Sequence, residues 1–193
     1  IAHRTLEIAR AVLSDTEARP YACAVGYHSY DGYDYCGQNP SAFAVEGSAR
    51  AELAGLCEHH GTEVWMTEVS NYRPAESAWH NTSFRMNQIF DDIEFGRVCA
   101  WDFMLDLWCG GWRLNARGGP QGLAEFYYEP DGSIRRMQMT WFGTAMGRFS
   151  RVIRPGWKSL PIEGAHPNLR ATAFADEFGG RLAVVLLNDG QIS

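Results

Sequence analysis

The chain has 193 residues, of which 46% are hydrophobic and 21% are charged, and this composition suits a globular protein with a sizeable core. Its formal net charge of −6 argues against nucleic acid or an anionic membrane as a partner, since both favour a basic surface. The sequence has no apolar run near the roughly 20 residues of a membrane helix, and it opens in helix-like sequence rather than in a signal peptide.

Helical and strand-like segments alternate through the first half of the chain. The spacing of apolar residues predicts helices over residues 3–19, 41–60 and 74–96, and strands over residues 21–28, 62–72 and 98–105. Pro20 ends the first helix, and Gly61 suits the C-terminal cap of the second. This alternation is typical of a parallel sheet whose strands are joined by crossover helices.

The second half of the chain changes character. Four features are predicted there: a loop rich in Gly and Trp over residues 108–119, a turn within 127–132, a helix over 139–153, and an antiparallel hairpin of residues 169–176 and 181–188. Pro155 and Gly156 end the helix. The hairpin indicates the start of an all-β region.

The predicted strand over residues 62–72 ends on a carboxylate. By the two-residue period of a strand, Val64 and Met66 share a face with Glu68. An acidic side chain on an apolar strand face is costly unless it is hydrogen-bonded or used, so Glu68 is a candidate for chemistry. The structural alternative is a strand-end Glu that faces water.

Each of the three predicted parallel strands ends in polar or aromatic residues: His28 and Tyr30, Glu68 and Asn71, and Trp101 and Phe103. In an α/β barrel such ends converge on one face, where active sites lie. A carboxylate with aromatic platforms suits glycoside hydrolysis, in which a flat ring lies beneath a sugar. Taken singly, His28 is more often a satisfied buried histidine than a catalytic one.

No metal or cofactor is expected. The five cysteines include no Cys-x-x-Cys pair, and no Gly-x-Gly-x-x-Gly fingerprint of a dinucleotide site occurs.

Several segments resemble glycoside hydrolase family 30, in clan A of the retaining (β/α)8 glycosidases: residues 64–69, 100–105, 118–120, 143–156 and 181–188. The sequence Phe-Ser followed by Arg-Pro-Gly, within residues 149–156, is the more specific part. The resemblance implies an α/β fold, with the C-terminal portion of a TIM barrel followed by the beginning of an antiparallel β-sandwich. Residues 1–156 would supply strands six to eight with their helices, and residues 157–193 the start of the sandwich.

The resemblance also implies roles for single residues. Glu68 matches the nucleophile of a retaining O-glycosyl hydrolase that acts on a β-linked polysaccharide or glycoside. The expected substrate-binding residues are His28, Tyr30, Asn71, Trp101, Phe103 and Trp108. Either Trp101 or Phe103 matches the aromatic beside the cleaved sugar, and Trp108 with Trp112 would extend the platform or simply cover the barrel mouth. The expected partner is a carbohydrate, and the parent enzyme is expected to be secreted or at the cell surface.

The chain departs from the family at the acid/base residue. That Glu belongs at the end of the fourth strand in an Asn-Glu pair, and no Asn-Glu occurs in the 193 residues. The sequence therefore reads as a fragment without strands one to five, which would associate through exposed sheet edges. The alternative is a catalytically dead fragment that binds carbohydrate or a partner. Residues 104–107 replace the basic cluster of glucuronoxylan-specific members, so a neutral glycan is expected.

Overall fold

A computed structural model describes residues 2–29, 49–69, 78–104, 107–109, 122–164 and 168–188. The chain forms two compact units. The first comprises Ile1–Pro74 and Asp91–Asp106, and the second comprises Ala75–Phe90 and Leu107–Ser193. The expected division between residues 156 and 157 stays a prediction.

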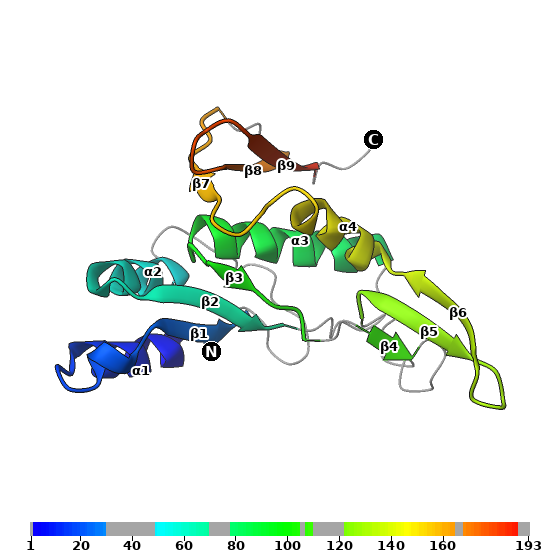
Figure 1. Cartoon of the computed structure of the whole chain (residues 1–193), viewed down its shortest axis with the longest axis horizontal. Helices are drawn as coiled ribbons and strands as arrows, with labels where there is room; N and C mark the ends of the chain where they lie inside the picture. Colours follow the sequence, from blue (N-terminus) through cyan, green and yellow to red (C-terminus); the bar gives the residue numbers. More distant parts are fainter. Residues whose placement is uncertain are drawn as a thin grey trace. The chain divides into compact units, whose positions relative to one another are not determined.

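The first unit contains a three-stranded parallel sheet of order β1-β2-β3 (Figure 1). Its elements follow one another as α1 (Ala2–Ser14), η1 (Arg19–Tyr21), β1 (Ala24–His28), α2 (Ala49–His60), β2 (Glu63–Glu68) and β3 (Ala100–Trp101). The alternation of helices and parallel strands predicted from the sequence is therefore confirmed here. Among the described residues no barrel is closed, so the partial-barrel interpretation stays a prediction.

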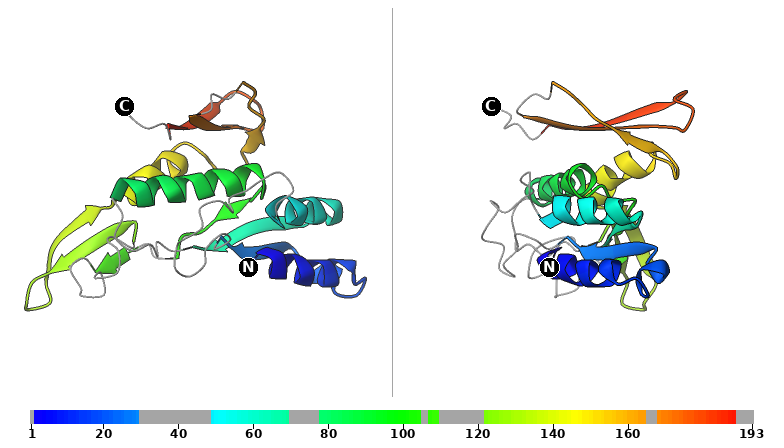
Figure 2. Two further views of the ribbon diagram at one scale, coloured as in Figure 1. Left: turned by 180° about the vertical axis from the view of Figure 1, so that it is seen from behind. Right: turned by 90° about the vertical axis from the view of Figure 1, so that its left-hand side faces the viewer.

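One face of this sheet is covered by helices. Helix α1 contacts β1 and helix α2 contacts β2, as Figure 2 shows. The buried side chains of this core are Leu6, Ala9, Leu13, Tyr27, Leu53, Cys57, Val64 and Met66. They alternate along β2, where Val64 and Met66 are buried while Glu63, Trp65 and Thr67 are exposed. The sheet thus has a covered face and an open face.

Helix α1 ends earlier than the apolar spacing predicted. It stops at Ser14, because the Asp15 carboxylate accepts hydrogen bonds from the backbone N–H groups of Glu17 and Ala18, at 2.7 and 3.0 Å. A short Asp side chain that binds its own following backbone favours a turn over a continued helix.

The described residues of the second unit form two further three-stranded sheets, helix α4 and most of helix α3. Helix α3 (Ala78–Glu94) belongs to this unit as far as Phe90, and its last four residues belong to the first unit. The other elements are β4 (Leu107–Cys109), β5 (Ala124–Tyr128), β6 (Ile134–Met139), α4 (Trp141–Ser150), β7 (Lys158–Leu160), β8 (Leu169–Ala175) and β9 (Leu182–Asn188). One sheet has the order β4-β5-β6 and the other β7-β8-β9. Strands β8 and β9 pair antiparallel throughout, which confirms the predicted hairpin.

The predicted loop over residues 108–119 is wrong at its start. Strand β4 occupies that position and pairs parallel with β5. The turn predicted within residues 127–132 is correct, but the sequence reading missed the two strands that it joins, β5 and β6. Strand β6 is exposed along its whole length, so it lacks the alternation of apolar and polar residues that reveals a half-buried strand.

Helix α4 begins at a cap that the sequence contains. The Thr140 hydroxyl accepts the backbone N–H of Gly143 at 2.9 Å, which satisfies one of the orphan donors at the helix start. Gly143 leaves no room for a side chain, because a Cβ there would collide with the Leu123 carbonyl. Phe149, at the far end of α4, makes an edge-on contact with Phe90 of α3, with ring centroids 5.5 Å apart.

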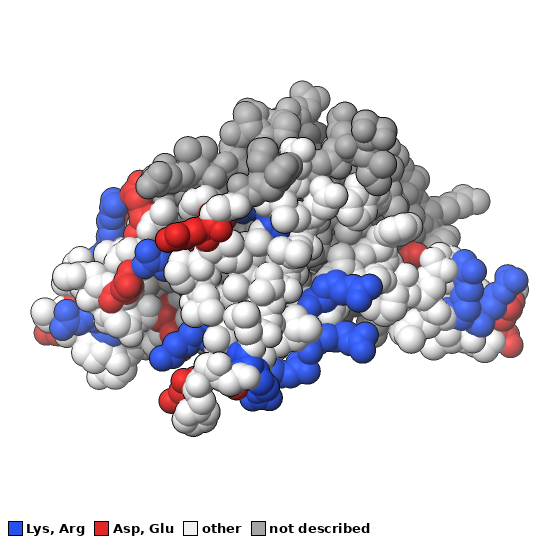
Figure 3. All heavy atoms as spheres, turned by 90° about the horizontal axis from the view of Figure 1, so that it is seen from above, with Lys and Arg blue, Asp and Glu red and all other residues white. Residues whose placement is uncertain are grey.

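The described surface carries charges of both signs. Figure 3 shows Lys and Arg interspersed with Asp and Glu on one face, among wide uncharged areas. None of the helices in the described ranges is long and apolar enough to span a membrane.

Candidate active site

Glu68 and His28 meet where strands β1 and β2 end. The Nε2 atom of His28 lies 3.6 Å from Oε2 of Glu68, and the two side chains are 41% and 35% exposed. That separation exceeds a direct hydrogen bond and makes an ion pair only when the imidazole is protonated. The carboxylate therefore lies at the carboxyl edge of a parallel sheet, in contact with solvent and beside an imidazole.

A β-bulge decides which way Glu68 points. Tyr27 pairs with Met66, but the next residue, His28, pairs with Glu68, so Thr67 is an extra residue in β2. Paired residues of neighbouring strands share a face, and His28 is on the face opposite Tyr27. Glu68 accordingly lies on the open face and not, as the two-residue period predicted, on the face of Met66.

The position of Thr67 agrees with this bulge. A Cβ added to Gly26 would lie 3.1 Å from Cγ2 of Thr67, so this side chain lies over the open face. Its hydroxyl donates to the Tyr27 carbonyl at 3.3 Å. Bulges recur beside active sites because they re-aim one side chain without ending the strand. A pattern of alternation alone does not reveal such an insertion.

Trp101 lies on the covered face. It pairs with Met66, and its indole N–H donates to Oδ2 of the buried Asp92 at 2.9 Å. The buried ring of Phe103 stacks parallel to that of Trp101, with centroids 6.4 Å apart and an interplanar angle of 8°. The structure therefore brings Trp101 and Phe103 together, but places Trp101 on the opposite face of the sheet from Glu68.

The remaining predicted site residues cannot be placed beside Glu68. Tyr30 and Asn71 lie outside the described residues, and so do Trp112 and the side chain of Trp108 in β4. Within the described part of the chain, no group of three or more His, Cys, Asp or Glu side chains has the arrangement of a metal site.

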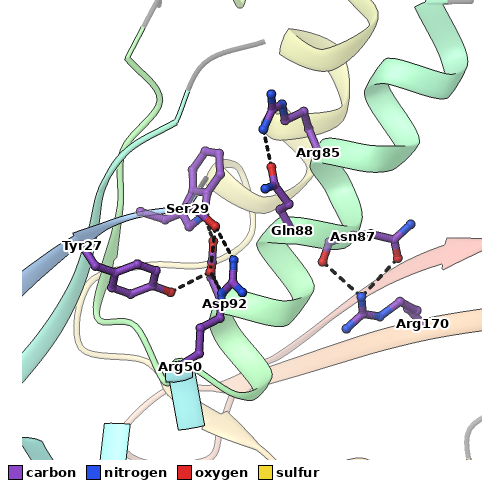
Figure 4. Close-up of polar contacts among 9 residues, drawn as sticks. Tyr27, Ser29, Arg50, Arg85, Asn87, Gln88, Asp92 and Arg170 are labelled. Atoms are coloured by element: carbon purple, nitrogen blue, oxygen red, sulfur yellow. Dashed lines mark hydrogen bonds and ion pairs between the residues drawn. The ribbon is translucent and has the colours of Figure 1, made fainter. Parts of the chain in front are cut away.

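A buried polar cluster behind the site was missed by the sequence reading. Oδ1 of Asp92, on α3, accepts hydrogen bonds from the Tyr27 hydroxyl at 2.6 Å, from Ser29 Oγ at 3.1 Å and from Arg50 Nε at 2.7 Å. Nη2 of Arg50 also donates to Ser29 Oγ at 2.8 Å. Figure 4 shows Tyr27, Ser29 and Arg50 converging on Asp92. With Trp101, these side chains tie β1, α2, α3 and β3 together.

The charged groups of this cluster are buried, so each needs a partner of opposite charge. Asp92 and Ser29 are fully buried and Arg50 is 2% exposed, so the opposite charges of Arg50 and Asp92 must compensate each other. Burial, and then the charge of Asp92, raise the pKa of Tyr27 far above its ordinary value, so the phenol stays protonated as a donor. In the sequence Arg50 and Asp92 are each one of several charged residues in their helices, so no local signal distinguished them.

Solved structures share this fold. SrfJ from Salmonella typhimurium is 14% identical, with a TM-score of 0.69, and the match covers 97% of this chain and 38% of that one. The catalytic domain of GH30 xylanase C from Talaromyces cellulolyticus is 16% identical over 92% of this chain and 35% of that one, with a TM-score of 0.56. The endo-beta1,6-glucanase BT3312 is 16% identical over 94% and 38%, also with a TM-score of 0.56.

The neighbours include glycoside hydrolases. At such low identity the likeness establishes a mixed α/β, glycosidase-like fold and nothing finer. The chain spans between 35% and 38% of the length of these three structures. No protein-family model matches the sequence.

Proposed function

We propose that this chain carries the nucleophile of a retaining β-glycosidase and that Glu68 is this nucleophile. The observation that carries the proposal is the position of its carboxylate, at the carboxyl edge of a parallel sheet, on the open face and beside His28. Active sites of α/β barrels gather at this edge. The fold shared with glycoside hydrolases and the resemblance of residues 64–69 to a nucleophile strand also support it.

The chemistry is a double displacement. A Glu68 carboxylate oxygen attacks the anomeric carbon and forms a glycosyl ester while the bond to the leaving oxygen breaks, and that oxygen takes a proton from a second carboxyl group. Water then attacks the same carbon, gives its proton to that group and releases Glu68. We assign to His28 the orientation of the carboxylate, either directly after a small movement or through a bridging water.

The proton donor is not assigned to any residue of this chain. In retaining enzymes the two carboxyl groups lie ~5–5.5 Å apart. Glu63 stands five residues before Glu68 on the same strand, which corresponds to ~16 Å, and its carboxylate accepts the indole N–H of Trp65 at 2.8 Å. Glu63 therefore does not fit the role, and the sequence has no Asn-Glu pair.

The alternative proposal is a protein that binds carbohydrate without cleaving it. For either function we propose a neutral β-linked glycan as the ligand, because residues 104–107 read Met-Leu-Asp-Leu and carry no basic group for a uronate. Tyr30, Asn71, Phe103 and Trp108 stay proposed ligand-binding residues. Trp101, whose indole N–H is bound by Asp92, is assigned to support of the site.

A mechanism-based label tests the nucleophile independently of the proton donor. Dinitrophenyl 2-deoxy-2-fluoro-β-glycosides have a leaving group that needs no protonation, and the fluorine slows hydrolysis of the ester. The purified protein would be incubated with the glucoside, xyloside and galactoside, and the labelled peptide identified by mass spectrometry.

We expect one sugar per chain on Glu68, loss of the label in Glu68→Gln, and unchanged labelling in the matched variant Glu63→Gln. Labelling of another residue, or none with any of the three sugars, would contradict the proposed nucleophile. Saturable binding of a neutral β-glucan or xylan without a label would instead support the binding alternative.

A further inference from the structure

Ser29 connects the buried polar cluster to the backbone of Glu68. Its hydroxyl donates to Oδ1 of Asp92 and accepts from Nη2 of Arg50, at 3.1 and 2.8 Å. Its backbone N–H donates to the carbonyl of Glu68 at 3.0 Å. One fully buried residue thus holds an interior ion pair with its side chain and the end of strand β2 with its main chain.

The bulge gives this connection a specific importance. Because the pairing of β1 with β2 shifts by one residue at Thr67, alternation along β2 alone does not set the direction of Glu68. The hydrogen bond from Ser29 N–H is made immediately after the bulge, at the residue that follows His28. A rigid anchor for Ser29 therefore fixes both His28, which precedes it, and the backbone that bears the Glu68 side chain.

The anchor itself is rigid for electrostatic reasons. Arg50 and Asp92 form a buried ion pair in which Nε of Arg50 and Oδ1 of Asp92 are 2.7 Å apart. Tyr27 donates to the same oxygen, and Trp101 donates to the other oxygen of Asp92. Displacement of Arg50 or Asp92 is costly, because it separates two buried opposite charges that solvent does not reach.

We propose that Ser29 is a positioning residue, which transmits the fixed geometry of the Arg50–Asp92 pair to Glu68. This role presupposes the proposed function, in which Glu68 is the nucleophile. Ser29 does not itself touch a reacting atom. Its effect is on the alignment of the carboxylate with the anomeric carbon, and misplacements near 1 Å reduce rates by as much as ~100-fold.

Ser29→Ala removes the hydroxyl and keeps the backbone N–H. Tyr27→Phe is the matched control, because it also removes one hydrogen bond to Oδ1 of Asp92 but leaves the Ser29 connection intact. Two measurements are compared: the kinetics of labelling by the activated fluoroglycoside, separated into binding constant and maximal rate, and hydrogen exchange of the residue 29 amide by NMR.

We expect Ser29→Ala to lower the maximal labelling rate by about tenfold or more with little change in the binding constant. Exchange of the residue 29 amide should accelerate by a similar factor. Tyr27→Phe should stay within about twofold of the wild type in both measurements, although its loss of thermal stability should be similar to that of Ser29→Ala. Wild-type labelling kinetics in Ser29→Ala, or an equal loss in Tyr27→Phe, would overturn the positioning role.

Ser29→Cys provides a second variant of nearly the same shape if Ser29→Ala does not fold. A thiol is only a weak hydrogen-bond donor, so the labelling rate should again fall, and a wild-type rate would overturn the proposal. If the wild-type protein is not labelled at Glu68, the proposed function fails by itself. Hydrogen exchange of the residue 29 amide then still tests whether Ser29 links the Arg50–Asp92 pair to the backbone of Glu68. Unchanged exchange in both Ser29 variants would reject that link.

Discussion

The hydroxyl of Tyr27 donates a hydrogen bond of 2.6 Å to the carboxylate of Asp92, across 65 positions of the sequence. This contact joins β1 to α3, and both side chains are almost completely buried. A phenol bound to a carboxylate in a dry environment keeps its proton, and this has a measurable consequence at alkaline pH.

Stability should fall above about pH 10 in a way that depends on Tyr27. Its pKa is raised on folding, chiefly by burial, so its contribution is complete below the pKa of the unfolded chain, near 10. Above that pH the unfolded phenol loses its proton while the folded one keeps it, so the free energy of unfolding falls by about 1.4 kcal/mol per pH unit. Urea unfolding between about pH 9 and 11 measures this slope. Equal slopes in the wild type and Tyr27→Phe would show that the phenol is not protected.

Replacement of Arg50 should be far more damaging than replacement of a surface arginine. Arg50→Met leaves Asp92 as a buried, uncompensated charge, and such changes cost about 3–5 kcal/mol. Arg10→Met is the matched control, because the ion pair of Arg10 with Glu52 is exposed and contributes little. Urea unfolding of both variants compares the two costs. A loss of less than about 1 kcal/mol in Arg50→Met would mean that the pair is not buried in solution.

Gly96→Ala should destabilise the same cluster from another side. An added Cβ would lie 2.6 Å from the backbone oxygen of Asp92 and 2.8 Å from the Tyr27 hydroxyl, so both must move, at a cost of about 1–3 kcal/mol. Gly55→Ala, inside helix α2 with open space around it, should instead stabilise by about 0.5–1 kcal/mol. Thermal unfolding distinguishes these opposite signs, and a neutral Gly96→Ala would contradict the close packing.

Two glycines of helix α4 allow an equivalent comparison in the second unit. A Cβ at Gly143 collides with the rigid backbone carbonyl of Leu123, so Gly143→Ala should cost about 3 kcal/mol or displace the helix. Gly147 has no atom within 4 Å of an added Cβ, so Gly147→Ala should gain about 0.5–1 kcal/mol of helix stability. Circular dichroism during thermal unfolding measures both, and similar melting temperatures for the two variants would be evidence against this packing.

The sequence predicted best what depends on local periodicity. The apolar stripe of α1, the strand that ends at Glu68 and the β8–β9 hairpin follow from neighbouring residues alone. The convergence of His28 and Glu68 followed from one further rule, that parallel strands end at the same edge of a sheet.

The sequence reading failed where a single residue or a distant contact decides the structure. Thr67 carries no sign that it is an inserted residue, yet it reverses the face of Glu68. Arg50 and Asp92 are 42 positions apart, and nothing near either one indicates the other. Exposed β6 has no periodic pattern to detect. Burial and long-range pairing are properties of the folded chain, so they become visible only in three dimensions.

The irregularity at Thr67 is one residue long, and its loss would have a disproportionate effect. If Thr67 instead paired with His28 in regular register, strict alternation along β2 would turn the Glu68 side chain toward the covered side of the sheet. A sugar approaching the open side would then meet the Thr67 side chain in place of the carboxylate. The direction of the proposed nucleophile thus depends on a difference of one residue between the paired lengths of two adjacent strands.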